Sequence, residues 1–189
     1  MAERGEMIVN PATGERIEFR TTRADSSGEE LQFELTLAPF GRVGGMPHQH
    51  PAEETIEVVE GTLTARIGRE RIHLHAGDSL VIPPARSHYL FNETPDDVRV
   101  IVRAQPALDF ETFFETVFEL ANARKDRSFR GLPAPLHALL LSGIYDVYAP
   151  AVPIGLQRPV LRALAPLARR RGYPTRVPPD RARGDAVPA

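Results

Sequence analysis

The chain contains no cysteine, and only Lys125 among its 23 basic lysine and arginine residues is a lysine. The absence of cysteine excludes disulfide bonds, thiolate metal sites and cysteine nucleophiles. Nitrogen and oxygen atoms must therefore hold any metal that the chain binds. No charged segment followed by an apolar run stands at the N-terminus, so we expect a cytoplasmic protein.

Long apolar runs and DNA-binding patterns are also missing. Residues 132–167 are largely apolar, but six prolines interrupt them, and no run of about 20 apolar residues remains to span a membrane. No helix-turn-helix pattern precedes or follows the strand-rich part of the chain, and we expect no nucleic-acid partner.

The charge is unevenly spread, although the net charge is only −2. Residues 158–183 contain eight arginines and one aspartate, a composition compatible with nucleic acid or anionic lipid. We interpret this stretch as a solvated helix end and tail. Association of Arg169–Arg171 with a membrane surface is the alternative.

Alternating apolar and polar residues dominate the first 105 positions. Leu31, Phe33, Leu35 and Leu37 alternate with polar residues, which is typical of a half-buried strand. Similar short patterns recur at roughly eight- to twelve-residue intervals with turns between them, which predicts an antiparallel, mainly β sandwich or barrel. The strands are expected at 7–9, 17–22, 31–37, 54–60, 62–67, 71–75, 79–82, 88–91 and 98–104.

After Pro106 the spacing of apolar residues becomes helical. A stripe from Phe110 to Ala121 predicts an amphipathic helix, and further helices are expected at 136–148 and about 158–170, after a charged linker at Arg124–Arg130. We divide the chain into a barrel (1–106), a helical extension acting as a lid or dimer interface (107–172) and a disordered tail (173–189). The apolar stripe leads us to expect a homodimer.

His48, His50 and Glu54 share the same even spacing, so their side chains point to one side if the segment is extended. His88 offers a further nitrogen downstream. Three imidazoles and one carboxylate suit a first-row divalent metal, and this donor set does not choose among Fe, Mn, Ni, Zn and Cu.

The same residues resemble the first motif of the cupin family. That motif places a glycine seven residues after its glutamate, as Gly61 follows Glu54 here, with the His-x-His pair at His48 and His50. The leading glycine of the motif is displaced, since Gly41 lies one residue too early.

The second cupin motif is also matched closely. Gly77, Pro83, His88 and Asn92 stand at the family spacing, and Ala85 replaces the glycine of the Pro-x-Gly turn. If that turn has a positive φ, alanine costs roughly 1 kcal/mol or forces a different turn.

The resemblance covers about residues 30–105 and implies a double-stranded β-helix, the jelly-roll barrel, with the N-terminal strands added to it. It implies metal ligands at His48, His50, Glu54 and His88, and a small-molecule ligand inside the barrel. An enzyme of dioxygenase type acting on a metal-chelating, partly apolar substrate fits this centre, with Glu54 as a catalytic base. A non-redox isomerase or lyase and a non-catalytic binding protein are the alternatives.

Three other candidates are assigned structural roles. His73 and His75 form a second His-x-His pair, but Ile72 and Leu74 are the apolar members of that strand, so the two histidines should face solvent. Glu53 is the neighbour of Glu54 on an extended segment, so its side chain should point away from the ligands. His137 falls in an apolar helix and is expected in the core or an interface.

The cavity lining should come from inward-facing residues of the strands, and most of these should simply be core. The candidates are Phe33, Leu35, Leu37, Ile56, Val58, Leu63, Ala65, Ile67, Leu80, Ile82 and Leu90.

Overall fold

The computed structural model describes residues 2–10, 12–44, 46–122, 135–150 and 152–178. The predicted linker at Arg124–Arg130 and positions 179–189 of the predicted tail lie outside these residues. In chain order the elements are β1 (Met7–Asn10), β2 (Glu15–Thr21), β3 (Leu31–Leu37), β4 (Glu53–Glu60), β5 (Thr62–Ile67), β6 (Glu70–His75), β7 (Ser79–Ile82), β8 (His88–Asn92), β9 (Val98–Gln105), α1 (Phe110–Asn122), α2 (Pro135–Tyr145) and α3 (Ile154–Arg170).

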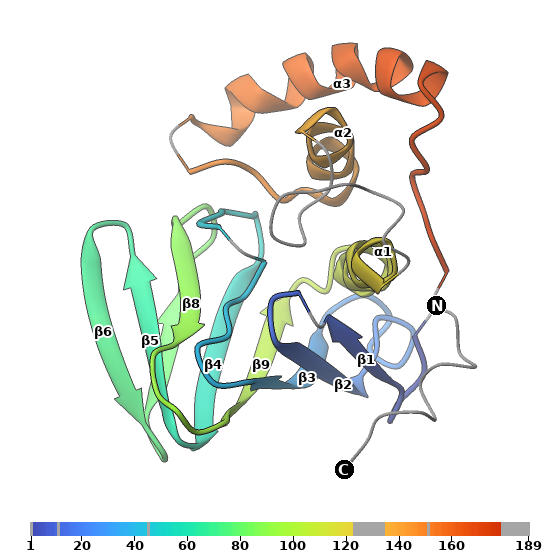
Figure 1. The fold of residues 1–189 in the computed structure, drawn as a ribbon. Helices are drawn as coiled ribbons and strands as arrows, with labels where there is room; N and C mark the ends of the chain where they lie inside the picture. Colours follow the sequence, from blue (N-terminus) through green and yellow to red (C-terminus); the bar gives the residue numbers. More distant parts are fainter. Residues whose placement is uncertain (1, 11, 45, 123–134, 151, 179–189) are drawn as a thin grey trace.

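The strands form two sheets with antiparallel pairing (Figure 1). One has six strands in the order β1-β2-β3-β9-β4-β7, and the other has three in the order β6-β5-β8. β1 and β2 join the larger sheet by pairing onto β3, as expected for the N-terminal strands. The predicted mainly β, jelly-roll architecture followed by helices is confirmed.

The core lies between the inner faces of the two sheets. Along β3 the residues from Leu31 to Leu37 alternate between buried and half-buried, so the predicted two-residue period is confirmed. Leu63 and Ala65 contribute the facing side chains from β5 and are fully buried. Each methylene removed from water here stabilises the fold by about 0.8 kcal/mol.

Three helical layers cover one side of the larger sheet (Figure 1). α1 lies nearest to the sheet, where Phe114 meets Phe33 edge to face with ring centres 5.3 Å apart. α2 lies farther out and α3 is outermost. α2 ends earlier than predicted because Asp146 has a left-handed backbone, with φ of 57°. No helix among the described residues is long and apolar enough to cross a membrane.

Two turns of the cupin-like motifs have left-handed backbones. Gly61 has φ of 81°, and a Cβ there would lie 2.8 Å from the carbonyl oxygen of Asp97, so a side chain is excluded. Ala85 retains the same handedness with φ of 59°, and its amide donates a 2.7 Å hydrogen bond to the carbonyl oxygen of His50. Alanine therefore does not force a different turn, and the chain accepts a strain of roughly 1 kcal/mol there.

Candidate metal centre

The His48–His50 segment is not the simple strand that its spacing suggested. Pro51 and Ala52 form a bend, and β4 starts only at Glu53. The segment is instead held by backbone pairing with β8, because the amides of His48 and His88 each donate to the other's carbonyl oxygen, at 3.0 and 2.9 Å. This pairing sets two imidazoles side by side although 40 residues separate them in the sequence.

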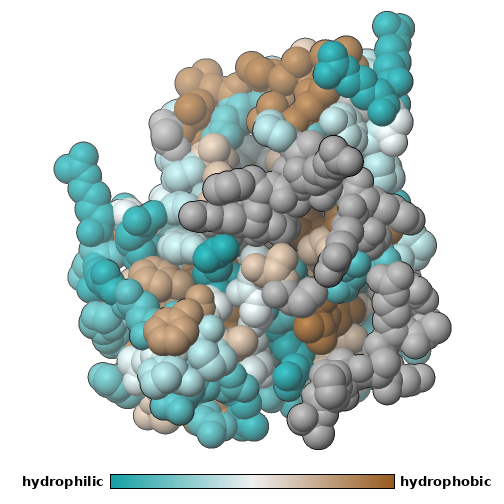
Figure 2. All heavy atoms as spheres, in the orientation of Figure 1, coloured by the Kyte–Doolittle hydropathy of each residue, from teal (hydrophilic) through white to brown (hydrophobic). Residues whose placement is uncertain are grey.

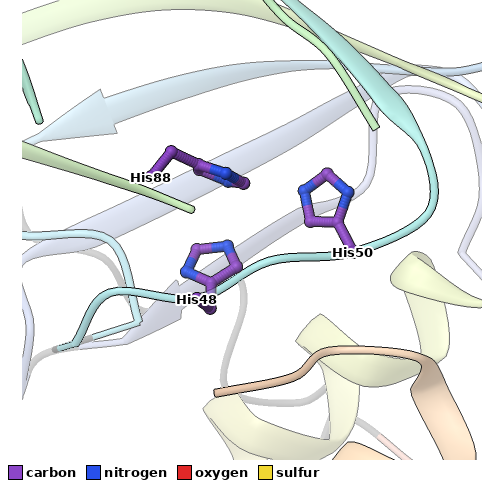
Figure 3. Close-up of side chains that lie close together, drawn as sticks. All are labelled: His48, His50 and His88. Carbon is purple, nitrogen blue, oxygen red and sulfur yellow. The ribbon is translucent and has the colours of Figure 1, made fainter. Parts of the chain in front are cut away.

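The structure brings three of the predicted ligands into one group. His48, His50 and His88 each offer a ring nitrogen, and these atoms lie within 4.8 Å of one another. Their rings face a common point (Figure 3). His50 and His88 are buried, whereas His48 is half-buried. Such a group could hold a metal ion.

Three backbone carbonyls orient the imidazole rings. The Nδ1 atoms of His48, His50 and His88 lie 3.4, 3.0 and 2.8 Å from the carbonyl oxygens of Met46, Ala52 and Arg86. A carbonyl oxygen can only accept, so each Nδ1 carries the hydrogen, and in the neutral ring Nε2 presents its lone pair. The same arrangement is common in histidines that bind metals.

The buried Nε2 atoms of His50 and His88 have no hydrogen-bond partner among the described residues. Leaving a buried polar atom unpaired costs about 1–3 kcal/mol. A divalent cation at the centre of the group would accept these lone pairs and remove that cost. The residues present therefore fit a metal with nitrogen and oxygen ligands.

Glu54, on β4, lies beside this group. Its Oε1 is 3.3 Å from His50 Nε2, and its Oε2 is 3.4 Å from His88 Nε2. These are ion-pair distances without hydrogen-bond geometry. The carboxylate is thus near two of the three imidazoles, and its role as fourth ligand stays a prediction.

The electrostatics of the cluster favour a negative carboxylate among imidazoles. Burial alone would raise the pKa of Glu54, but His50, together with His88 and His48, outweighs burial and lowers that pKa to about 2. Burial, together with the other histidines, lowers the pKa of His48 and His88. Burial also opposes the charged form of His50, but the charge of Glu54 raises its pKa. The carboxylate of Glu54 and the imidazole of His50 therefore stabilise each other's charged forms.

A cavity opens beside the cluster. Its empty volume is about 400 Å³ when the solvent-filled mouth is counted. It is lined by Glu15, Ile17, Phe33, Leu35, Val43, His48, Glu54, His88, Leu90, Val102 and Phe114. Phe33, Leu35 and Leu90 were predicted to line it, whereas most of the other strand candidates are core residues.

Sequence reasoning missed two functional features of this cavity. Glu15 is its only acidic lining residue besides Glu54, and it could have been found by extending the inward alternation of Ile17 and Phe19 one step back along β2. Phe114 belongs to the predicted helical stripe, but only the packing of α1 against the sheet places it on the cavity wall.

The remaining candidates lie as predicted. His73 and His75 are exposed on β6, where their rings contact Thr64 and Thr62. Glu53 is exposed. His137 is buried in α2, and its Nε2 lies 2.8 Å from the carbonyl oxygen of Pro174. None of the four belongs to the histidine group.

Gln49, between the two histidines, fastens their segment to the helical extension. Its backbone exchanges two hydrogen bonds with Tyr148, at 2.9 and 2.8 Å. Its side-chain amide donates to the carbonyl oxygens of Ala149 and Val152, both at 2.8 Å. The loop between α2 and α3 therefore helps to set the position of His48 and His50.

Replacing Gln49 by alanine should weaken metal binding about tenfold, as loss of an orienting contact beside a metal site does. Gln157→Ala is the matched control, because Gln157 donates to the same two carbonyls from the exposed side without touching the histidine segment. Competition with a chromophoric chelator for Zn²⁺ measures both affinities. Equal affinities in the two variants would show that Gln49 does not position the ligands.

Comparison with known proteins identifies the region that carries these residues. Residues 33–103 match the family model described as Cupin domain. No curated protein matches the chain. Solved structures that it resembles include KdgF from Halomonas sp., at 22% identity over 56% of this chain and 92% of that one, with a TM-score of 0.48.

Two further structures are similar to the same part of the chain. The polyketide cyclase RemF from Streptomyces resistomycificus is 19% identical over 56% of this chain and 78% of its own, with a TM-score of 0.47. An RmlC-like cupin from Shewanella frigidimarina is 22% identical over 58% of this chain and 92% of its own, with a TM-score of 0.46.

Proposed function

We propose that this chain, whose residues 33–103 form a domain of the cupin family, is a metal-dependent enzyme of dioxygenase type. Its substrate is a small molecule with a metal-chelating end and a partly apolar body. The observation that carries the proposal is the set of inward-facing imidazole nitrogens at the wall of a largely apolar cavity. His48, His50, Glu54 and His88 are the proposed ligands.

A redox-active divalent metal held by these residues would supply a Lewis acid for the chelating oxygens and electron transfer toward dioxygen. Both oxygen atoms enter the substrate in a dioxygenase reaction, so no separate reductant is required. The chain itself supplies the geometry of the donors, because the Nδ1 contacts keep each imidazole in one orientation.

Glu54 is the proposed proton acceptor. Its carboxylate lies beside the histidine cluster and on the cavity wall, so it can take the proton from a substrate hydroxyl or enol as that oxygen approaches the centre. The neighbouring His50 keeps the carboxylate deprotonated and so able to accept, while the same contact lowers the pKa of Glu54 and weakens it as a base.

The cavity wall selects the body of the substrate. Phe33 and Phe114 approach edge to face and offer aromatic contacts, while Ile17, Leu35 and Val102 complete an aliphatic surface. Transfer of apolar surface from water to such a wall contributes about 25 cal/mol per Å². A diketone or hydroxylated aromatic compound therefore fits better than a highly charged substrate.

A non-redox reaction is the second candidate, favoured by the close contact of Glu54 with His50. A carboxylate oxygen of Glu54 lies 3.3 Å from His50 Nε2 on the cavity side, so a proton acceptor stands beside the proposed metal ligands. Proton transfer on a carbonyl compound polarised by a metal would give isomerase or lyase chemistry.

Metal analysis and oxygen uptake test the proposal in sequence. Untagged protein, stripped with a chelator and reloaded separately with Fe, Mn, Zn and Ni, should retain close to one ion per chain after desalting. Iron- or manganese-loaded protein should then consume oxygen with a panel of diketones and catechols. Absence of metal retention would refute the metal centre. Retention of the metal, with conversion of a substrate but without oxygen uptake, would favour the non-redox alternative.

A further inference from the structure

Only one side of the α3 helix packs against the other residues that the structure describes. One side packs on α2, where Leu161 is buried and its Cβ lies so close to Gly143 that a Cβ on that glycine would be 2.9 Å away. The other side faces outward, because α3 is the outermost layer of the fold (Figure 1). The outward side therefore has no protein partner within the described chain.

The outward side carries an apolar stripe. Leu156, Val160 and Leu167 are 64%, 58% and 45% exposed. Their spacing of four and then seven residues places them on one face of the helix, and Figure 2 shows hydrophobic side chains gathered over α3. Exposed apolar residues that are contiguous in this way mark an interaction surface more often than isolated ones do.

Arginines accompany this stripe without acidic residues. Residues 147–179 contain six arginines and no aspartate or glutamate. Arg158 pairs with Asp146, and Arg176 lies near Glu115. Arg162 and the Arg169–Arg171 cluster are exposed, and none of them forms an ion pair with a described residue. The surface is thus both apolar and strongly positive.

We propose that α3 docks this protein on the surface of an anionic phospholipid bilayer. The apolar stripe enters the boundary between headgroups and acyl chains, and the arginines contact lipid phosphates. A helix of 17 residues is about 25 Å long and can lie flat in that boundary. The inference does not depend on the metal centre.

Charge argues against a second copy of the chain as the occupant. A two-fold pairing through α3 would place the same positive face against itself, and like charges across an interface repel. An acidic protein would match the charge, but the stripe offers no exposed aromatic anchor of the kind that usually dominates protein interfaces. A fluid anionic surface requires no shape complementarity and matches both features.

Vesicle co-sedimentation tests the proposal with the full chain. We expect binding to vesicles of equal phosphatidylcholine and phosphatidylglycerol, weaker binding at high salt, and little binding to phosphatidylcholine alone. Leu156→Asp should reduce the partition coefficient at least about tenfold, since a buried leucine contributes about 1.5–3 kcal/mol. Phe40→Asp is the matched control, because Phe40 is 66% exposed and far from α3 in sequence, and its left-handed backbone suits aspartate.

Three results would overturn the proposal. The first is equal binding to the two kinds of vesicle, or no binding to either. An acidic protein would then be the better candidate partner for the outward face of α3. The second is an equal loss in Leu156→Asp and Phe40→Asp. The third is a lipid-free dimer in sedimentation velocity that Leu156→Asp dissociates. Replacing Arg169, Arg170 and Arg171 by glutamine keeps the apolar stripe and should also weaken binding to anionic vesicles.

Discussion

Replacing His50 by alanine should abolish stoichiometric metal binding, whereas replacing His73 by alanine should leave it intact. Both residues belong to a His-x-His pair, so they are matched in local sequence. They differ in surroundings, because His50 Nε2 is buried in the cluster without a hydrogen-bond partner among the described residues, and His73 is exposed beside Thr64. Removing one of three imidazoles takes away a donor that the carboxylate of Glu54 cannot replace.

The measurement is metal content per chain after reconstitution and desalting, together with Zn²⁺ affinity by chelator competition. Thermal unfolding of both metal-free variants shows whether each still folds. His88→Ala provides a second cluster variant, from β8, and it should behave like His50→Ala. If metal content falls equally in His50→Ala and His73→Ala, the ligand assignment is wrong.

The second large effect concerns Glu15, whose buried carboxyl lies on the cavity wall. Burial raises the pKa of Glu15 from 4.5 to about 7, although hydrogen bonds from Thr13 and the amide of Gly44 oppose the shift. The folded state therefore keeps a proton that the unfolded chain has lost between these pH values. Stability from this group is complete below pH 4.5 and is lost as the pH rises through about 7.

We expect the free energy of unfolding of the wild type to fall by about 3 kcal/mol relative to Glu15→Gln between pH 4.5 and 8. Glutamine keeps the shape and an oxygen that accepts from Gly44, but it has no proton to lose. Urea unfolding in the presence of a chelator measures the difference at each pH. Glu18→Gln, which removes a charge from a half-buried position on the same strand, controls for net charge. A difference between wild type and Glu15→Gln that does not vary with pH would contradict the prediction.

The elements that the sequence predicted correctly are those that depend on neighbours along the chain. The alternation from Leu31 to Leu37 became β3, and the aromatic stripe from Phe110 became α1. Hydrophobic periodicity acts over a few residues, so it can be recognised without knowing what the buried face contacts. The bend at Pro51 was not predicted, because the even spacing of His48, His50 and Glu54 was interpreted as one extended segment.

The histidine cluster was predictable in its membership and not in its geometry. His48, His50 and His88 were selected by motif spacing, and the structure brings their nitrogens together. The pairing of the His48 segment with β8 joins residues 40 positions apart, which no local pattern specifies. Glu54 remains a predicted fourth ligand.

Donor chemistry and short-range patterns were therefore determined by the sequence alone: a centre without thiolates, an antiparallel β core, and helices after Pro106. Only the tertiary structure decided that Phe114 lines the cavity, that Gln49 ties the histidine segment to the loop before α3, and that one apolar face of α3 points outward. The physical reason is that side-chain type and periodicity are local, whereas burial and hydrogen-bond partners depend on segments far apart in the sequence, such as Gln49 and Ala149, which are 100 residues apart.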